Sequence, residues 1–204
     1  MKFRILAAVA AATVAISMPV IAQQANSDAR AVQAGSYVVE TSHTRVLFSL
    51  NHFGFNDYYG EFADATGSLV IDPKNPAASK LDVSVPVASV STSNATLDEE
   101  LKGADWFDAA QFPAIRFVSI AVQQTGANTA KVTGNLTMHG VTKPVVLDAT
   151  FNAAGANPLS KTFTTGFHVQ GMIRRSDFGV DKYVLLVGDE VKLVICGAFE
   201  KIAA

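Results

Sequence analysis

Four histidines and one cysteine are the side chains best suited to catalysis or metal binding in this sequence, and their spacing favours neither. The histidines are His43, His52, His139 and His168. No two of them show the short spacing on one helix or ribbon that zinc sites commonly use. Cys196 stands in an apolar stretch, residues 191–199, where we expect a small buried hydrophobe rather than a nucleophile. The sequence allows a metal site only if the fold brings His43 and His52 close together.

The motifs that build common active sites are also missing. The sequence has no Gly-x-Ser-x-Gly elbow, no phosphate-binding glycine loop and no dinucleotide fingerprint. The acidic pair Glu99–Glu100 is expected on the solvent face of a helix. The 16 Lys and Arg against 18 Asp and Glu give a net charge of −2 and no basic surface for nucleic acid. We therefore predict a protein that is not an enzyme, with no catalytic residues, metal, cofactor or nucleic-acid partner.

Large apolar side chains are the feature that remains, and they are spread along the whole chain. Those that could face a common interior are Phe48, Phe62, Trp106, Phe107, Phe112, Phe117, Met138, Phe163 and Phe167. Each could fill a solid core or line a cavity, and the sequence leaves both readings open. Between Thr162 and Gly171, however, Gly and Thr recur where a filled core would place larger residues. This thinning of side-chain bulk favours a cavity.

The elements that must position these residues are mostly strands. Residues 81–85 and 163–173 alternate with a period of two, which is typical of a strand with one buried face. Other strand-like segments are 37–40, 45–50, 58–62, 67–71, 115–122, 131–138, 145–151 and 190–199. Many short sequential strands predict an all-β antiparallel sheet. A closed barrel and a two-sheet sandwich both fit this pattern.

One segment, at about residues 94–103, breaks the strand pattern. It starts with polar residues, carries acidic residues near its N-terminal end, and has Leu97 and Leu101 at helical spacing. These features predict a short helix that ends near Gly103.

The N-terminus is typical of an exported protein. Lys2 and Arg4 precede an apolar run, and Val20-Ile21-Ala22 offers a cleavage site, so residues 1–22 are predicted to be a signal peptide. The alternative, an uncut anchor, needs a run of about 20 apolar residues, which is longer than this one. We expect a flexible linker at 23–35 and one domain at 36–204. The expected location is the periplasm, and a single cysteine leaves no internal disulfide.

Six segments in order resemble the YceI-like family, periplasmic lipocalin-like proteins associated with the binding of polyisoprenoids and other amphiphiles. They are residues 37–48 (with His52 downstream), 60–62, 101–108, 111–117, 134–145 and 173–180. The chain departs from the family pattern at Glu40, where Asp is usual, and at Thr44, where Ser is usual. The resemblance implies an extended eight-stranded antiparallel barrel, a short helix near one end, a long interior pore and a homodimer.

The resemblance and the apolar residues together predict a binding or carrier protein for an isoprenoid or other lipid-like molecule. A polar mouth that selects the head group is predicted at His43, Asn51, His52, Arg175 and Asp177. The alternative for Arg175 and Asp177 is a salt-bridged turn, and for His43 a hydrogen-bonded strand end. Two other functions stay open. One is delivery of quinone to a transient membrane partner, and the other is an enzyme that uses a histidine as base.

Overall fold

The structure is a computed structural model that describes residues 25–203, so the predicted signal peptide lies outside the described residues. The chain forms one short α-helix, α1 (Ala95–Lys102), and eleven strand segments. The strand segments are β1 (Gly35–Val39), β2 (Arg45–His52), β3 (Asn56–Phe62), β4 (Thr66–Ile71), β5 (Lys80–Pro86), β6 (Val90–Ser91), β7 (Ala114–Gln124), β8 (Thr129–Met138), β9 (Val141–Ala156), β10 (Phe163–Arg174) and β11 (Glu190–Lys201).

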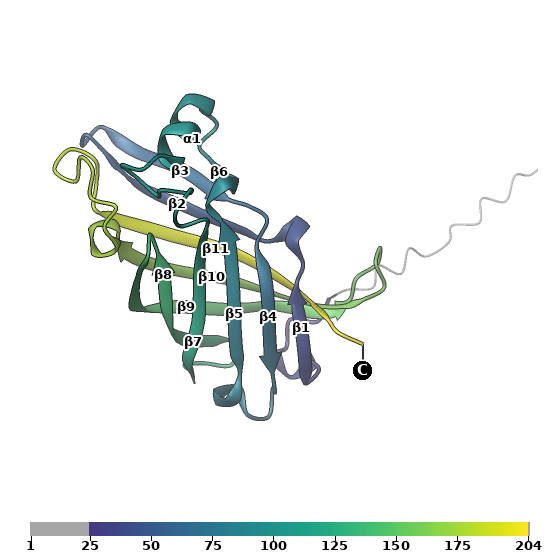
Figure 1. Cartoon of the computed structure of the whole chain (residues 1–204). Helices are drawn as coiled ribbons and strands as arrows, with labels where there is room; N and C mark the ends of the chain where they lie inside the picture. The colour runs from purple at the N-terminus through teal and green to yellow at the C-terminus, as the bar shows by residue number, and fades with distance from the viewer. Residues whose placement is uncertain (1–24, 204) are drawn as a thin grey trace, which may run out of the picture.

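These segments form one closed antiparallel barrel (Figure 1). The sheet order is β1-β4-β5-β7-β8-β9-β10-β11-β2-β3-β6, and an additional pairing of β1 with β11 closes the ring. Three pairs of consecutive segments, β1 with β2, β3 with β4, and β5 with β6, are each one strand interrupted by a few residues. Counted in this way the wall has eight strands, which confirms the predicted eight-stranded barrel over the sandwich.

The register of the long strands β7 to β10 is set by the alternation of inward and outward side chains and by the turns between the strands. His139 and Gly140 form a two-residue turn between β8 and β9, and both have positive φ, 50° and 74°. Such left-handed turns match the twist of the flanking strands. Along β9 the exposed Val146 follows the inward-facing Val145, as the period of two requires.

The wall opens between β6 and β7, which do not pair in the described chain, and α1 lies above this gap (Figure 1). Asn94 caps the helix, because its side chain accepts hydrogen bonds from the backbone N–H groups of Thr96 and Leu97. The helix ends at Gly103, which confirms the predicted short helix. Trp106 and Phe107 follow it and fill the opening, and the Phe107 ring packs edge-on against Phe62 at 5.5 Å.

Residues 25–34, which belong to the segment predicted as a linker, pack against the opposite end of the barrel. We call them the strap. Asn26 exchanges backbone hydrogen bonds with Ala154 at 2.8 and 2.9 Å, and the Asn128 side chain donates to the Ser27 carbonyl. Val32 is buried beside Phe151 and Ala154.

Residues 25–203 contain neither a candidate membrane-spanning helix nor a candidate metal cluster. No helix there is long and apolar enough to cross a membrane. Within the same range, no group of three or more His, Cys, Asp and Glu side chains could hold a metal ion.

Candidate functional site

A cavity of about 400 Å³ runs through the barrel. Its wall is built from inward-facing residues of every long strand, among them Val83, Val132, Val145, Val169 and Leu193. These residues are only half-buried, although they point to the interior. Because a filled core would bury them, the barrel is hollow. The volume lies within the range of about 300–1,000 Å³ that small-molecule sites occupy.

Glycines keep this interior open by letting aromatic rings lie flat against the wall. A Cβ atom built on Gly60 would come within 2.3 Å of the ring of Phe48, its cross-strand partner. A Cβ on Gly134 would come equally close to the ring of Phe117, at 2.3 Å. Real Cβ contacts are essentially never this short. Each ring therefore occupies the space that the Cβ of any other residue would need. A larger residue at either position would push the ring towards the cavity.

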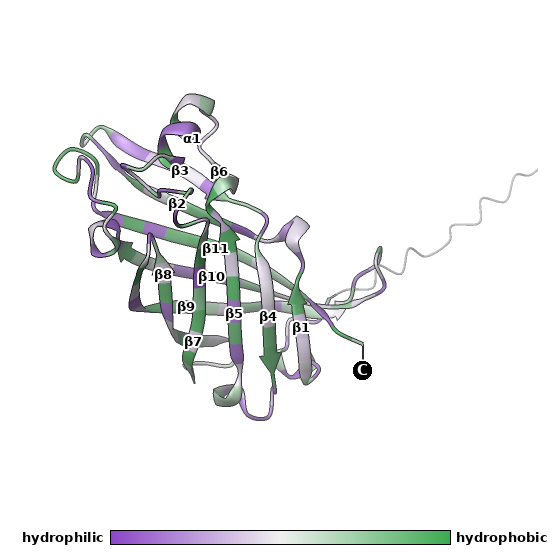
Figure 2. Ribbon diagram, in the orientation of Figure 1, coloured by the Kyte–Doolittle hydropathy of each residue, from purple (hydrophilic) through white to green (hydrophobic). Residues whose placement is uncertain are grey.

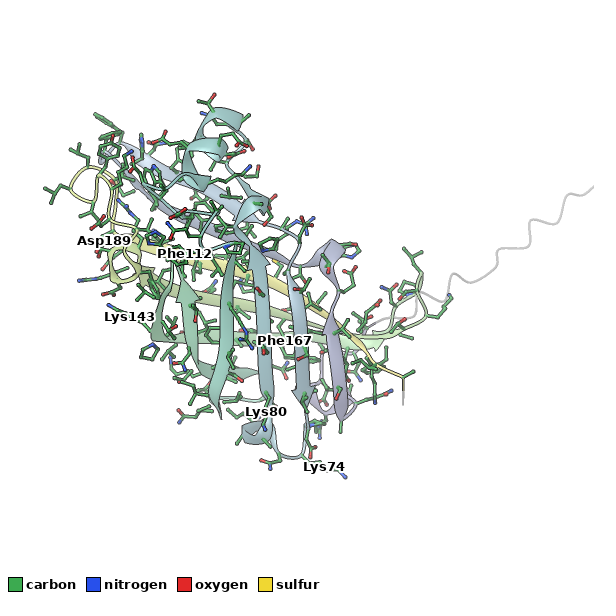
Figure 3. All side chains as sticks on the ribbon, in the orientation of Figure 1. Lys74, Lys80, Phe112, Lys143, Phe167 and Asp189 are labelled. Carbon is green, nitrogen blue, oxygen red and sulfur yellow. The ribbon has the colours of Figure 1, made fainter. Side chains whose placement is uncertain are left out.

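The two ends of the cavity differ. At the end near α1 the lining residues Leu101, Trp106, Met138, Arg175 and Val180 are all buried. We call this the closed end. At the other end the lining residues are exposed or half-exposed and lie on the β4–β5 turn, the β7–β8 turn and the strap; they are Arg30, Pro73, Pro76, Ser79, Lys80, Gln124, Ala127, Asn128 and Thr129. We call these residues the mouth. In Figure 3, Lys74 and Lys80 mark this end, and Phe167 lies midway along the barrel.

Arg175 fixes the closed end from within. Its side chain is 4% exposed, and its guanidinium donates to the carbonyl oxygens of Val180, Lys182, Val187 and Gly188 at 2.7–2.9 Å. Its charge also lies 5.5 Å from the centre of the Trp106 ring. Burial lowers the pKa of Arg175, and the charges of Asp189 and Asp181 act in the opposite direction. Arg175 therefore organises the loop that follows β10.

The five residues predicted to share a polar mouth do not come together. Asp177 is exposed and pairs with Lys143 at 2.8 Å, so the predicted salt-bridged turn with Arg175 does not form. Arg175 lines the cavity, but at the closed end. The remaining three, His43, Asn51 and His52, do not line the cavity.

Each of those three has a local role. His43 is exposed at the end of the β1–β2 interruption, where its Nδ1 lies 2.6 Å from Glu40. The side chain of Asn51 accepts from the backbone of Gly54 in the β2–β3 turn. The ring of His52 stacks edge-on against Phe53 at 4.3 Å. His43 lies before the start of β2 and His52 at its end, so the structure gives no geometric basis for a metal site shared by the two.

Seven of the nine predicted apolar residues line the cavity: Phe48, Phe62, Trp106, Phe107, Phe117, Met138 and Phe167. The two others do not. Phe112 packs edge-on against His139 at 5.0 Å and does not line the cavity. Phe163 packs against the core from the start of β10.

Sequence reasoning missed the polar residues of the mouth and misplaced Cys196. The mouth residues Ser79, Lys80, Gln124 and Asn128 sit in or beside turns, where a polar residue has no distinctive signal. Cys196 is exposed rather than buried. Its neighbours Ile195 and Gly197 face the cavity, so the period of two turns Cys196 outwards.

The chemistry available inside the cavity is limited. Its lining within the described residues includes no His, Asp, Glu or Cys, and its charged groups are Arg30, Lys80 and Arg175. Among residues 25–203, no imidazole, carboxylate or thiol therefore faces the interior. What the cavity offers is a long apolar surface with polar groups at its two ends.

A closed antiparallel barrel with an apolar interior defines the class of β-barrels able to enclose one small ligand. A YceI-like domain matches residues 37–199, and the chain belongs to this family. A UPF0312 protein of Pseudomonas savastanoi pv. phaseolicola is 40% identical over 149 residues, 72% of this chain and 77% of that protein. The predicted family is thereby confirmed.

Solved structures share the fold. The crystal structure of the Campylobacter jejuni YceI protein matches with a TM-score of 0.67 at 30% identity and covers 75% of this chain and 90% of that one. A structure described as a polyisoprenoid binding domain from Saccharophagus degradans matches with a TM-score of 0.62. It is 13% identical and covers 83% of this chain and all of that one, so this likeness concerns the fold alone.

Proposed function

We propose that this protein binds and carries a long apolar amphiphile, such as a polyisoprenoid, an isoprenoid quinone or a similar lipid, inside its barrel. The observation that carries the proposal is the hollow interior, whose wall between the two ends is almost entirely aliphatic and aromatic. The fold shared with a polyisoprenoid binding domain supports the same ligand class. The absence of acids, histidine and cysteine from the described lining supports binding over catalysis.

The driving force is burial of the ligand's hydrocarbon chain. Each buried CH₂ group contributes about 0.8 kcal/mol, so a tail of about twenty carbons gains roughly 16 kcal/mol before losses. Ordering the chain and fixing the ligand offset a large part of this gain. An apolar wall does not distinguish one hydrocarbon from another. Selection among ligands then falls to the polar head group.

We place the head group at the mouth, where the lining turns polar. Ser79, Gln124 and Asn128 offer hydrogen-bonding groups there, and Lys80 offers a positive charge. The exposed Lys74 lies at the same end (Figure 3). We further propose that the protein works in the periplasm, as its N-terminal residues predict, and that it forms the homodimer implied by the family resemblance.

Native mass spectrometry with organic extraction, on protein purified without detergent from cells that export it, tests the proposal. We expect a bound hydrophobic species of defined mass. Val145→Trp, which fills the interior, is expected to lower the bound fraction roughly tenfold or more. Val146→Trp is the matched control, because Val146 is the next residue on β9 and points outwards.

Val169→Trp repeats the test from β10, in case Val145→Trp disturbs folding. An apo mass that does not change after incubation with polyprenyl lipids and quinones would overturn the proposal. Equal ligand loading of the inward and outward Trp variants would also overturn it.

A further inference from the structure

Five large apolar side chains are exposed together on two adjacent loops near the closed end. Phe53 and Phe55 lie in the β2–β3 turn, and Tyr183, Leu185 and Leu186 lie in the loop between β10 and β11. Leu185 is 96% exposed and Phe55 is 89% exposed. We call residues 52–56 and 183–188 the tip. Figure 2 shows both loops coloured as apolar where they project past the barrel wall.

The tip is a built structure and not two loose loops. The backbone N–H of Phe53 donates to the Leu186 carbonyl at 3.0 Å, and that of Gly188 donates to the Asn51 carbonyl at 2.7 Å. Arg175 holds the second loop from below through four carbonyl oxygens. The two loops therefore present their apolar side chains as one rigid surface.

Two bulky residues of the tip have a left-handed backbone conformation. Phe53 and Tyr183 have φ values of 55° and 60°, in the left-handed region that bulky residues rarely adopt. Such strained residues persist only where the surrounding structure enforces them, and they cluster at functional sites. Two strained aromatic residues on a surface that is also costly to expose to water indicate that this surface is used.

The chemistry of the tip identifies its partner. Neither loop of the tip contains Asp, Glu, Lys or Arg. Of the charged residues that flank the tip, Lys182 pairs with Asp105 and Asp57 pairs with Lys192. Protein interfaces also use Tyr and Phe, but they surround them with a polar rim and add Arg. An apolar projection whose own loops carry no charge suits the interfacial region of a bilayer better. A bilayer also accommodates a projection without a preformed groove.

We propose that the tip docks this protein on the surface of a lipid bilayer by inserting these apolar side chains. The tip is continuous with the cavity, because the Tyr183 ring packs edge-on against Trp106 at 6.3 Å. Docking therefore brings the closed end to the bilayer and leaves the mouth facing water. Because no charge drives it, binding requires no anionic lipid and is insensitive to salt. This inference goes beyond ligand carriage and does not depend on what the cavity holds.

Flotation with vesicles of pure phosphatidylcholine tests the proposal. We expect the wild-type protein to float with the vesicles at low and high salt alike. The double variant Phe55→Ser/Leu185→Ser is expected to lower the bound fraction roughly tenfold or more, because two large side chains no longer enter the bilayer. The matched control is Ile120→Ser/Met172→Ser, which removes two exposed apolar residues from the barrel wall. All variants share the same N-terminal residues, so the comparison isolates the tip.

Several results would overturn the inference. They are failure of the wild-type protein to float, equal losses in the tip and wall variants, and binding that needs anionic lipid or disappears in salt. The wild-type protein could instead self-associate with rising concentration and not bind vesicles. If the tip variant abolished that self-association, the partner of the tip would be a second copy of this chain. Ligand loading measured by native mass spectrometry on the same samples separates this question from carriage. A loaded protein that does not float refutes docking alone, and an empty protein that floats refutes carriage alone.

Discussion

The two ends of the barrel are built in opposite ways. At the closed end a buried arginine, a buried tryptophan and a helix shut the cavity, and backbone carbonyls are gathered around one guanidinium. At the mouth, two turns and the strap surround the opening with exposed polar side chains, and the strap is held by a few hydrogen bonds. One end is shut by a buried charge and packed side chains, and the other is surrounded by exposed polar side chains.

This difference follows from how each end meets water. At the closed end the wall separates between β6 and β7, and an unfilled gap would expose the apolar interior along the side of the barrel. The aromatic residues after α1 fill it. At the mouth the strands run to regular turns, so the opening needs no plug. The contrast makes distinct predictions for stability and for ligand exchange.

The largest effect is expected at Arg175. Arg175→Met keeps the volume but leaves four carbonyl oxygens without their donor. Buried groups left unpaired cost about 1–3 kcal/mol each, in part recovered by water, so we expect a loss of about 3–5 kcal/mol. Urea unfolding measures it. Arg174→Met is the control, because that exposed residue forms a 3.6 Å ion pair and its loss is expected to cost less than about 0.5 kcal/mol. Similar losses in both variants would remove the structural contrast between the ends.

The next effect concerns the wall that joins the two ends. Gly134→Ala places a methyl group where the Phe117 ring lies, and we expect the ring to move into the cavity. Overpacking of this kind costs about 1–3 kcal/mol, and ligand binding is expected to weaken as well. Gly166→Ala is the control, since its Cβ would meet nothing closer than 3.9 Å. Thermal unfolding and titration with a fluorescent polyprenyl probe measure both quantities. Unchanged probe affinity in Gly134→Ala would show that the ring has another place to go.

A bulky residue at the mouth is expected to change kinetics rather than stability. Ala127 is exposed and lines the mouth, so Ala127→Trp should slow probe association several-fold with a change in stability within about 0.5 kcal/mol. Ala110→Trp places the same bulk on an exposed residue near the closed end. Stopped-flow mixing with the probe compares the two. Slower association in Ala110→Trp alone would show that ligands enter through the closed end.

The smallest effect is expected at Glu40, between β1 and β2. Burial raises the pKa of its carboxyl, but hydrogen bonds from the ring and backbone of His43 and from the backbone of Ser42 outweigh this and hold the pKa below its ordinary value of 4.5. A lowered pKa in the folded state stabilises the protein above the unfolded-state pKa, and this contribution is lost as pH falls through the folded-state pKa. Glu40→Gln should therefore cost about 0.5–1 kcal/mol at pH 7 and little near pH 3. Urea unfolding at both pH values checks this, and a constant difference would assign the effect to packing.

Local patterns in the sequence determined the elements of this protein. The period of two along residues 163–173 predicted the strand that forms β10, since successive side chains of a strand point to opposite sides. The caps at Asn94 and Gly103 set the bounds of α1, because capping depends on neighbouring residues only. The order of the family-like segments was enough to predict an eight-stranded barrel.

Only the tertiary structure decided whether the barrel is hollow and which end is open. Both depend on how side chains from different strands share space, as Phe117 of β7 does with Gly134 of β8. The same holds for Arg175, which looked like a head-group contact or half of a salt bridge. Its guanidinium N–H groups instead donate to backbone carbonyl oxygens up to 13 residues further along the chain. Local sequence fixes the direction of a side chain relative to its own strand, whereas the groups that it meets are set by the closure of the barrel.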